Sequence, residues 1–524
     1  MMRPLPRWPI AIASTVFLAL TIVLVQSVIQ ANGQLTYSLD DPYIHLSVAR
    51  NLFGHGVWGI TPLAGASASS SPAWTILNGL TGTSLWGPLV LNIGAGLLVL
   101  TIAGWVCAQH QLQTRATLVL LVVLVFFVPL PALVLTGMEH LLQLALCMLF
   151  LGLWGQLWNK DQGPHFAWLG LISFLLVSTR FEGLFLAGLG AVMLLFKGPG
   201  GPGVNRDIRS GLSILVGVVA PLLLHGTIAM WSGGFYLPNS IMLKTKAGTG
   251  LAMFDVTRLL GHLGEAYYLT LLLIILAGTL LLEYRARKFT PAVACGFLVL
   301  ATAVAHLQFA DVGWFFRYDA YLIGLAALYC IILLTESGGW FSRLDELGLG
   351  RFAVVLVAAT VVVVPLGARS SASLQMTVPA TTHIHLQQVQ MGRFVGQFYD
   401  GKVVAANDVG AISYFGSASI LDLWGLASNQ VAEARLAEQY GPEQMAAIAR
   451  DNNVSIAIVY EEAFEWFGGL PPEWEAMGRW SITNRQPLSM NVVTFFAVDP
   501  RERDRLAESL ESFELPREVN FERR

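Results

Sequence analysis

The sequence predicts a polytopic α-helical membrane protein of about eleven transmembrane helices, followed by an α/β domain outside the membrane. Three observations support this fold class. The 524 residues are 55% hydrophobic and 12% charged, with a mean hydropathy of +0.60, whereas soluble domains carry about 25% charged residues. The net charge is +5 over residues 1–369 and −8 over residues 370–524. The apolar runs also stop near residue 369, so we expect a transmembrane domain at 1–369 and a cap domain at 370–524.

Eleven apolar stretches are candidates for membrane spans, each of which takes about 20 residues. They cover residues 10–29, 86–108, 116–135, 139–157, 166–179, 183–197, 210–231, 264–282, 290–308, 317–335 and 352–368. The first stretch follows Arg3 and Arg7 and so resembles a signal peptide, but it is long enough to span and no small-residue cleavage site follows it. We interpret it as an uncleaved span. The fifth and sixth stretches are short, as expected for a kinked pair that enters the membrane only partly.

The orientation follows from the positive charges. If the N-terminus is cytoplasmic, 12 of the 19 Lys and Arg residues of the first domain fall in cytoplasmic segments, as the positive-inside rule requires. An odd number of spans then places the acidic cap domain on the outer face. The isolated charges at span ends also gather on that face, mainly in the outer loop 31–74 and in the connections near residues 136–140, 178–183, 236–246 and 311–318. This convergence predicts an active site at the outer membrane–water boundary.

The cap domain alternates helical and extended patterns. We expect a helix at 381–399, a strand at 402–407, a loop and short helix at 408–416, a strand at 419–423, a helix at 431–450, and strands at 454–460 and 491–498. This alternation is typical of a small α/β domain.

Two adjacent carboxylates, Asp40 and Asp41, follow the first span directly. Charged groups near a bilayer are costly and call for a reason. Asp41 before Pro42 predicts a helix N-cap, with a helix from Pro42 to about Phe53 that stops at Gly54 or Gly56. Asp40 has no such cap to make, so we expect it to be a catalytic base with Asp41 beside it.

Cations at the outer ends of spans suit a phosphate leaving group. The predicted donor-phosphate ligands are Arg180, Lys244, Lys246 and Arg317, together with His45, which shares a helix face with Asp41. Snorkelling to lipid headgroups is the alternative for these cations. For Arg317 a structural pair with Asp311 or Asp319 competes as well.

Further polar residues are expected to orient these cations or to bind the acceptor. They are Ser69 and Ser70 of the serine-rich loop 61–74, Glu139, Glu182, Asn239, Tyr318 and Asp408. The alternatives are a plain linker for the serines, the cap of a re-entrant helix for Asn239, and turn capping for Asp408 and for Asp422.

The sequence carries no cofactor signature. All four cysteines lie in apolar spans, the histidines do not cluster at zinc spacing, and no nucleotide-binding fingerprint opens a helix. A carboxylate pair and a lipid phosphate together are able to hold Mg²⁺ or Ca²⁺, but nothing further in the sequence supports a metal or a nucleic-acid partner. An activated donor on the outer face should therefore be lipid-borne.

A set of motifs along the chain resembles the GT-C superfamily of integral-membrane glycosyltransferases, and within it the mycobacterial terminal arabinofuranosyltransferase B family. The motifs are Asp40-Asp41-Pro-Tyr-Ile-His, Ala49-Arg50-Asn51-Leu52, Ser70-Ser71-Pro72-Ala73-Trp74, Thr136-Gly-Met-Glu139, Thr179-Arg180-Phe-Glu182-Gly183, Leu237-Pro238-Asn239-Ser-Ile-Met-Leu-Lys244, Arg317-Tyr318, Asn407-Asp408-Val-Gly410 and Asp422-Leu-Trp-Gly425-Leu426.

The resemblance implies an enzyme of the bacterial inner membrane. Such an enzyme moves a sugar from a polyprenyl-phosphate donor to a cell-envelope glycan, lipid or protein, and its first outer loop carries the base, which falls on Asp40. The loop 61–68 lacks the carboxylate common in relatives, so the sugar stays open between arabinofuranose and a hexose such as mannose. The rival functions are a transporter or flippase of a lipid-linked sugar, which is expected to show internal repeats, and a membrane-anchored ligand-binding protein.

Overall fold

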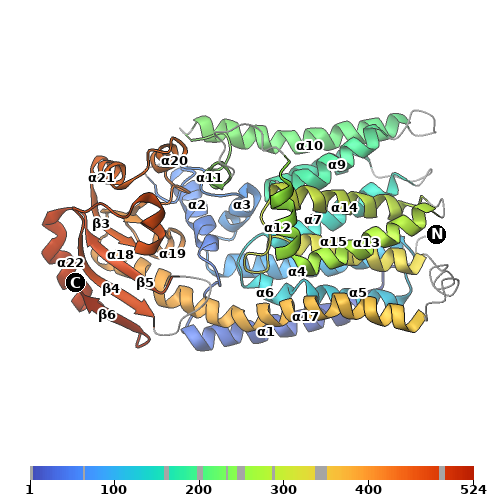
Figure 1. Ribbon diagram of the computed structural model, residues 1–524, viewed down its shortest axis with the longest axis horizontal. Coiled ribbons are helices and arrows are strands. Elements are labelled where there is room, and N and C mark those ends of the chain that lie inside the picture. Colours follow the sequence, from blue (N-terminus) through green and yellow to red (C-terminus); the bar gives the residue numbers. More distant parts are fainter. Residues whose placement is uncertain are drawn as a thin grey trace.

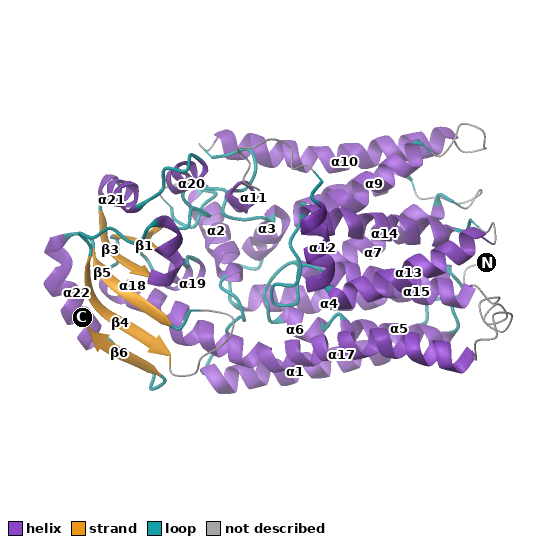
Figure 2. Cartoon of the chain, viewed as in Figure 1, coloured by secondary structure: helices purple, strands orange, loops and turns teal. Residues whose placement is uncertain are grey.

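The computed structural model consists of a long helical bundle with an α/β domain at one end (Figures 1 and 2). The structure describes residues 4–62, 65–158, 165–196, 204–231, 234–244, 254–285, 289–336, 351–482 and 490–524. The N-terminus lies at the end of the bundle that is remote from the α/β domain (Figure 1). The bundle and the domain enclose a middle layer of short helices.

Each of the eleven predicted stretches is largely helical. The bundle helices are α1 (Arg7–Asn32), α4 (Trp86–Gln109), α5 (Thr114–Phe127), α6 (Leu130–Val134), α7 (His140–Gln156), α8 (Phe166–Thr179), α9 (Gly183–Leu195), α10 (Val204–Trp231), α13 (Tyr267–Arg285), α14 (Pro291–Phe309), α15 (Ala320–Glu336) and α17 (Arg351–Ile384). Five described helices, namely α1, α4, α10, α13 and α14, are long and apolar enough to cross a membrane. The chain is thus a multi-pass helical membrane protein.

Two bundle segments differ from their predicted form. The stretch 116–135 is interrupted at Val128–Pro129 and forms α5 and α6, because Pro129 cannot donate to the helix. The last helix, α17, does not stop near residue 369 but continues to Ile384. The expected domain boundary therefore falls inside one continuous helix, which carries the chain from the bundle into the α/β domain.

The short pair α8 and α9 packs tightly on the long helix α10. A Cβ on Gly217 of α10 would collide with the carbonyl oxygen of Gly170 in α8, so glycine at both positions allows the two backbones to approach. With 14 residues, α8 is about 21 Å long, less than the ~30 Å of a hydrocarbon core. This length agrees with the expectation that the pair does not cross fully.

The middle layer consists of α2 (Asp41–His55), α3 (Pro72–Leu80), α11 (Asn239–Lys244) and α12 (Val256–Glu265) (Figure 1). The predicted cap at Asp41 is wrong: α2 includes Asp41 as its first residue, and its N-cap is Asp40, whose side chain makes no capping hydrogen bond. The helix ends at Gly56, whose φ of 70° suits glycine. The carboxylates of Asp40 and Asp41 are therefore both available for contacts outside α2.

The α/β domain contains a six-stranded sheet in the order β2-β1-β3-β5-β4-β6. The strands are β1 (Val403–Ala406), β2 (Ser419–Asp422), β3 (Val454–Val459), β4 (Glu475–Ile482), β5 (Val492–Ala497) and β6 (Val519–Arg523), with helices α18 (Gln390–Phe398), α19 (Gly410–Phe415), α20 (Asn429–Leu436), α21 (Pro442–Asp451) and α22 (Arg503–Ser512). β1 pairs in parallel with β2 and β3, and the remaining pairs are antiparallel. The carboxyl ends of the three parallel strands consequently share one edge.

The sequence predicted four of these strands and missed two. The strands predicted at 402–407, 419–423, 454–460 and 491–498 correspond to β1, β2, β3 and β5. The single helix predicted at 431–450 is two helices, because Gly441-Pro442 ends one and begins the other. β4, β6 and α22 were not predicted. Each of these elements pairs with or packs on neighbours that are distant in sequence. Its burial therefore depends on contacts that its own sequence pattern does not reveal.

Candidate active site

Asp40 joins the membrane domain to the α/β domain. Its Oδ2 accepts a hydrogen bond from the backbone N–H of Gly410 at 2.6 Å, and its Oδ1 accepts one from Ala411 at 2.7 Å. Both donors lie at the start of α19. A Cβ on Gly410 would collide with the backbone oxygen of Asp40 and lie 2.7 Å from its carboxylate. The residue expected to be a base thus has both oxygens occupied in a close contact between the domains.

Asp408 of the α/β domain is the electrostatic neighbour of Asp40. Desolvation, followed by the charge of Asp408, raises the pKa of Asp40 to about 8, and desolvation likewise raises the pKa of Asp408. The pair therefore holds a proton near neutral pH. The two backbone hydrogen bonds lower the pKa of Asp40, but desolvation and the charge of Asp408 outweigh them.

Asp41 points to the other side of the junction and pairs with Arg317. Arg317 Nη2 donates to Asp41 Oδ2 at 2.6 Å, and the Asp41 side chain keeps 41% of its surface exposed. The competing pairs predicted for Arg317 are absent from the described residues: Asp311 pairs with Arg258 at 3.3 Å and Asp319 with Arg369 at 3.0 Å.

The guanidinium of Arg317 has hydrogen-bond donors that find no acceptor among the described residues. The residue is 3% exposed, and its Nε and Nη1 have no hydrogen-bond partner among the described residues. Buried donors of this kind are normally satisfied. Two N–H groups of a planar guanidinium are the donors that suit a phosphate.

Arg180 stands in a second set of ion pairs. Its Nη1 donates to Glu139 Oε1 at 2.8 Å, and its Nη2 and Nε donate to Glu182 at 2.6 and 3.1 Å. The Tyr318 ring lies close to both arginines, with centroids 5.5 Å from the Cζ of Arg180 and 5.0 Å from that of Arg317. Glu139 and Glu182 thus hold the guanidinium of Arg180 through three charge-assisted hydrogen bonds.

His45 is held in a buried hydroxyl network. Its Nδ1 lies 3.0 Å from Thr75 Oγ1 and 3.1 Å from Ser69 Oγ, and its Nε2 lies 3.9 Å from Glu139 Oε2. Burial lowers the pKa of His45 below its ordinary value. The imidazole is accordingly neutral at neutral pH, and it contributes a hydrogen bond rather than a charge.

Asp41, Arg317, Arg180 and His45 line a cavity of about 340 Å³, which we call the arginine cavity. Its lining comprises Asp41, Ile44, His45, Ala68, Ser70, Met138, Arg180, Phe181, Glu182, Leu184, Phe185, Ser240, Ile241, Arg258, Phe309, Ala310, Asp311, Arg317, Tyr318 and Leu426. Three arginines thus line one space, together with Asp41, His45, Ser70, Glu182 and Tyr318 from the residues that the sequence singled out.

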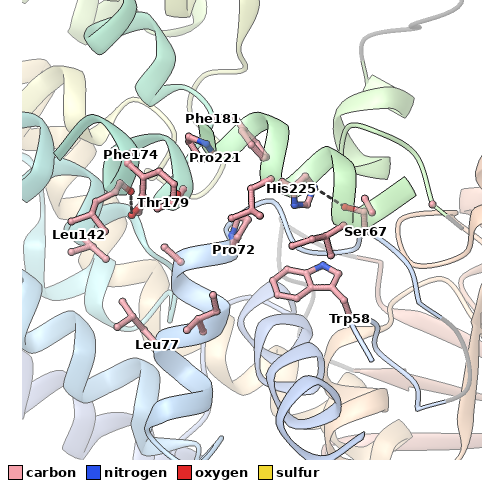
Figure 3. A pocket seen from close by; sticks show the side chains of 18 of the residues that line it. Trp58, Ser67, Pro72, Leu77, Leu142, Phe174, Thr179, Phe181, Pro221 and His225 are labelled. Atoms are coloured by element: carbon pink, nitrogen blue, oxygen red, sulfur yellow. Dashed lines mark hydrogen bonds between the residues drawn. The ribbon is translucent and has the colours of Figure 1, made fainter. Parts of the chain in front are cut away.

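A second cavity, the apolar groove, adjoins the arginine cavity at Phe181, which lines both. It has a volume of about 520 Å³ and lies between α3, α7, α8 and α10. Figure 3 shows side chains such as Leu77, Leu142, Phe174 and Pro221 around it, with His225 hydrogen-bonded to Ser67 at its rim.

A third cavity of about 430 Å³, which we call the carboxylate cavity, lies between the two domains. Its lining comprises Ser38, Leu39, Asp40, Asp41, Trp314, Phe315, Ala380, His383, Ile384, Gln388, Asn407, Asp408, Trp424, Leu426, Tyr460, Ala463 and Met490. Asp41 and Leu426 line this cavity and the arginine cavity alike. Asp41 therefore stands where the two spaces meet.

The remaining predicted residues lie elsewhere or outside the described residues. The Asn239 amide donates to Gly425 O at 3.1 Å and to Asn429 Oδ1 at 3.2 Å, so it contacts the α/β domain. Lys244 is the last residue of α11, and its side chain lies outside the described residues, as does all of Lys246. Sequence reasoning missed Arg258, Gln388 and Tyr460. Arg258 could have been found from its charge in an outer segment, whereas no local feature of the sequence distinguishes Gln388 or Tyr460.

The described part of the chain contains no group of three or more His, Cys, Asp or Glu residues placed to hold a metal ion. The positive charge that faces the arginine cavity comes from guanidinium groups.

Comparisons with known proteins place the fold. A family model described as a domain of unknown function (DUF8728) matches residues 380–496. No curated protein matches the sequence. The structure is similar to that of ArnT from Cupriavidus metallidurans bound to undecaprenyl phosphate, with a TM-score of 0.54 and 12% identity over 93% of this chain and 98% of that one. It is also similar to the oligosaccharyltransferase of Archaeoglobus fulgidus in complex with Zn and sulfate, with a TM-score of 0.52 and 14% identity over 98% and 74% of the two chains.

At such identities the likeness shows the fold alone. The expected architecture, a helical membrane domain with a C-terminal α/β domain, is confirmed at that level, whereas membership of the GT-C superfamily stays a prediction. The narrower resemblance to arabinofuranosyltransferases stays a prediction.

Proposed function

We propose that this protein is a membrane glycosyltransferase that moves a sugar from a polyprenyl-phosphate donor to an acceptor hydroxyl. One observation carries the proposal. The apolar groove adjoins, at Phe181, a cavity lined by Arg180 and by Arg317, whose buried Nε and Nη1 have no hydrogen-bond partner among the described residues. A long apolar chain that ends in a phosphate would fit the apolar groove with its chain and the arginine cavity with its phosphate.

The donor lies along both spaces in this proposal. The prenyl chain occupies the apolar groove, where burial of each CH₂ contributes about 0.8 kcal/mol. Its phosphate is bound by Arg317 and Arg180, with His45, Ser70 and Tyr318 around it. Lys244 and Lys246 are proposed as further phosphate ligands from their sequence positions. The similarity to ArnT, whose structure is described as bound to undecaprenyl phosphate, supports this class of carrier.

Asp41, rather than Asp40, is the better base in this geometry. Asp41 is exposed to the space between the arginine and carboxylate cavities, whereas both oxygens of Asp40 accept backbone N–H groups. Asp41 takes the proton from the acceptor hydroxyl, and the oxygen attacks the anomeric carbon. The bond from that carbon to the phosphate oxygen breaks, and polyprenyl phosphate leaves with its charge stabilised by the arginines. A single displacement inverts the anomeric centre.

Asp40 acts as a positioning residue in this scheme because it fixes α19 against the start of α2. Arabinofuranose and a hexose such as mannose are both proposed as the sugar. The acceptor is proposed to be a glycan, lipid or protein of the cell envelope, reached from the outer face of a bacterial cytoplasmic membrane with the N-terminus inside.

Donor turnover tests the proposal. Purified protein in lipid nanodiscs is incubated with polyprenyl-phosphate sugars of several sugars and chain lengths, with and without EDTA, and free polyprenyl phosphate is followed by mass spectrometry. We expect release from one donor with inversion of the transferred sugar. Asp41→Asn should lower transfer about 10²–10⁴-fold, the usual contribution of a general base.

The matched control is Asp400→Asn, which alters an exposed aspartate of the α/β domain and should leave turnover unchanged. Full transfer by a correctly folded Asp41→Asn protein would remove Asp41 from the mechanism. No release from any donor, even with acceptor-containing membranes added, would reject the glycosyltransferase in favour of a transporter or a ligand-binding protein.

A further inference from the structure

The carboxylate cavity is built as a ligand site. Its volume of about 430 Å³ lies within the range of about 300–1,000 Å³ typical of small-molecule sites. Part of its wall is supplied by the carboxyl ends of the three parallel strands. Asn407 and Asp408 directly follow β1, Trp424 follows β2 by two residues, and Tyr460 directly follows β3. Ligands of open α/β sheets bind at this edge.

The charge of the cavity selects against anions. Its described lining includes the carboxylates of Asp40, Asp41 and Asp408, and no lysine or arginine. A phosphorylated or carboxylated acceptor would bring like charges together, which should weaken its binding. Carboxylates do accept hydrogen bonds from hydroxyl groups. The cavity therefore favours an uncharged ligand with many hydroxyls.

The other polar groups of the cavity are consistent with this. Gln388 Nε2 donates to Asp408 Oδ2 at 2.9 Å and to Tyr460 OH at 3.1 Å. Gln388 is 2% exposed, and its Oε1 has no hydrogen-bond partner among the described residues. Trp314 and Trp424 add aromatic surface to the lining. A few convergent polar groups on apolar and aromatic walls characterise sites for small molecules.

We infer that the carboxylate cavity binds the acceptor as an uncharged sugar unit, and that residues 380–496 serve as its recognition wall through Asp408 and Gln388. This inference rests on the proposed function, because it assumes that the arginine cavity holds the donor. The acceptor hydroxyl then reaches Asp41 from the side opposite the phosphate. The arrangement assigns a binding role to a domain whose family description gives none.

Binding and transfer are measured with the full-length protein in nanodiscs. The probes are methyl glycosides of glucose, galactose, mannose and arabinofuranose, each compared with its phosphate monoester. Intrinsic tryptophan fluorescence reports binding because Trp314 and Trp424 line the cavity, and mass spectrometry reports transfer. We expect at least one neutral glycoside to bind and to accept the sugar, and its phosphate ester to be at least tenfold weaker in both readouts.

Two variants test the residues. Asp408→Ala should weaken binding of the neutral glycoside about tenfold. Asp451→Ala, at an exposed aspartate of the same domain, is its control. Ala463→Lys adds a cation at the cavity wall and should improve binding of the phosphate ester about tenfold. Ala437→Lys, at an exposed position outside the cavity, should not.

The outcomes separate the two proposals. Equal or tighter binding of the phosphate esters, or no weakening in Asp408→Ala, overturns the inference even where donor hydrolysis is normal. Absence of polyprenyl phosphate release from every donor rejects the proposed function, and the inference that rests on it falls with it.

Discussion

The arginine cavity and the carboxylate cavity meet at Asp41 but differ in charge and in origin. The arginine cavity is lined by Arg180, Arg258 and Arg317, and nearly all of its wall comes from the membrane domain and the middle layer. The carboxylate cavity carries Asp40 and Asp408, with no lysine or arginine among its described lining residues, and it exists only where the α/β domain meets those layers.

Because of this difference, donor binding and acceptor binding depend on different parts of the protein. The phosphate of a donor needs cations, and these are fixed by ion pairs inside the membrane domain. A neutral acceptor needs hydrogen-bond acceptors, and these depend on how the α/β domain docks. Damage to one cavity should therefore be separable from damage to the other.

The largest effect should come from breaking the arginine cavity. Arg317→Gln removes the cation with two unpartnered N–H groups and also breaks its ion pair with Asp41. We expect donor turnover to fall about 10²–10³-fold, the usual loss when one donor to a developing anion is deleted. Arg317→Lys should lose less, because it keeps the charge but not the fork. Release of polyprenyl phosphate is the readout.

A matched ion pair in the α/β domain provides the control for Arg317→Gln. Arg479 pairs with Glu461 at 2.6 Å, the same distance as in the Arg317–Asp41 pair, and it lines neither cavity. Arg479→Gln should leave donor turnover within about twofold. Equal losses in the two variants would mean that a general structural effect, and not phosphate binding, explains the result.

A smaller and more selective effect should follow from displacing the α/β domain. Gly410→Ala places a Cβ against the backbone oxygen and carboxylate of Asp40, which must separate α19 from the start of α2. We expect transfer to the acceptor to fall about tenfold or more, while hydrolysis of the donor by water declines much less. The ratio of transfer to hydrolysis, measured in one assay, detects this change.

Gly54→Ala is the control for that experiment. Gly54 lies in α2 itself, and a Cβ there meets nothing within 4 Å, so alanine should be tolerated and its helix propensity is better. Parallel loss of transfer and hydrolysis in Gly410→Ala would show that the two cavities do not act independently.

The sequence was sufficient for features that depend on local pattern. Apolar runs of the right length predicted the bundle helices, because backbone groups in a bilayer must be satisfied within each helix. Short extended patterns predicted β1, β2, β3 and β5, and the charge of single residues at span ends identified part of the arginine cavity. Arg180 and Arg317 stood out for this reason.

The sequence was insufficient where contacts join distant parts of the chain. Asp40 meets Gly410 and Ala411 across about 370 residues, and no local pattern distinguishes such a contact from a catalytic role. The partner of Arg317 lies 276 residues away, whereas the aspartates beside it in sequence pair with other arginines. Gln388 and Tyr460 join the carboxylate cavity only through the docking of the α/β domain.

The smallest effect concerns the pH dependence of that docking. Asp40 and Asp408 face Asp41, Tyr43 and Tyr460 from the surrounding elements. In the unfolded chain both carboxyls ionise near pH 3.9, but in the folded protein desolvation raises both pKa values, that of Asp40 to about 8. Between these pH values the folded state binds more protons than the unfolded state, so its stability decreases as the pH rises and levels off above about 8.

The apparent melting temperature should accordingly fall by a few degrees from pH 5 to pH 8, as measured by intrinsic fluorescence in nanodiscs. Asp408→Asn removes one titrating group of the pair, so its melting temperature should fall less steeply with pH. The melting temperature of Asp400→Asn should fall as steeply as that of the wild type. If the melting temperature fell equally steeply with pH in all three proteins, groups other than Asp40 and Asp408 would be responsible for the pH dependence. A reduced slope in Asp408→Asn alone would show that the carboxylate cavity holds its proton in the folded state, and hence that its two acids lie together as the docking of the α/β domain requires.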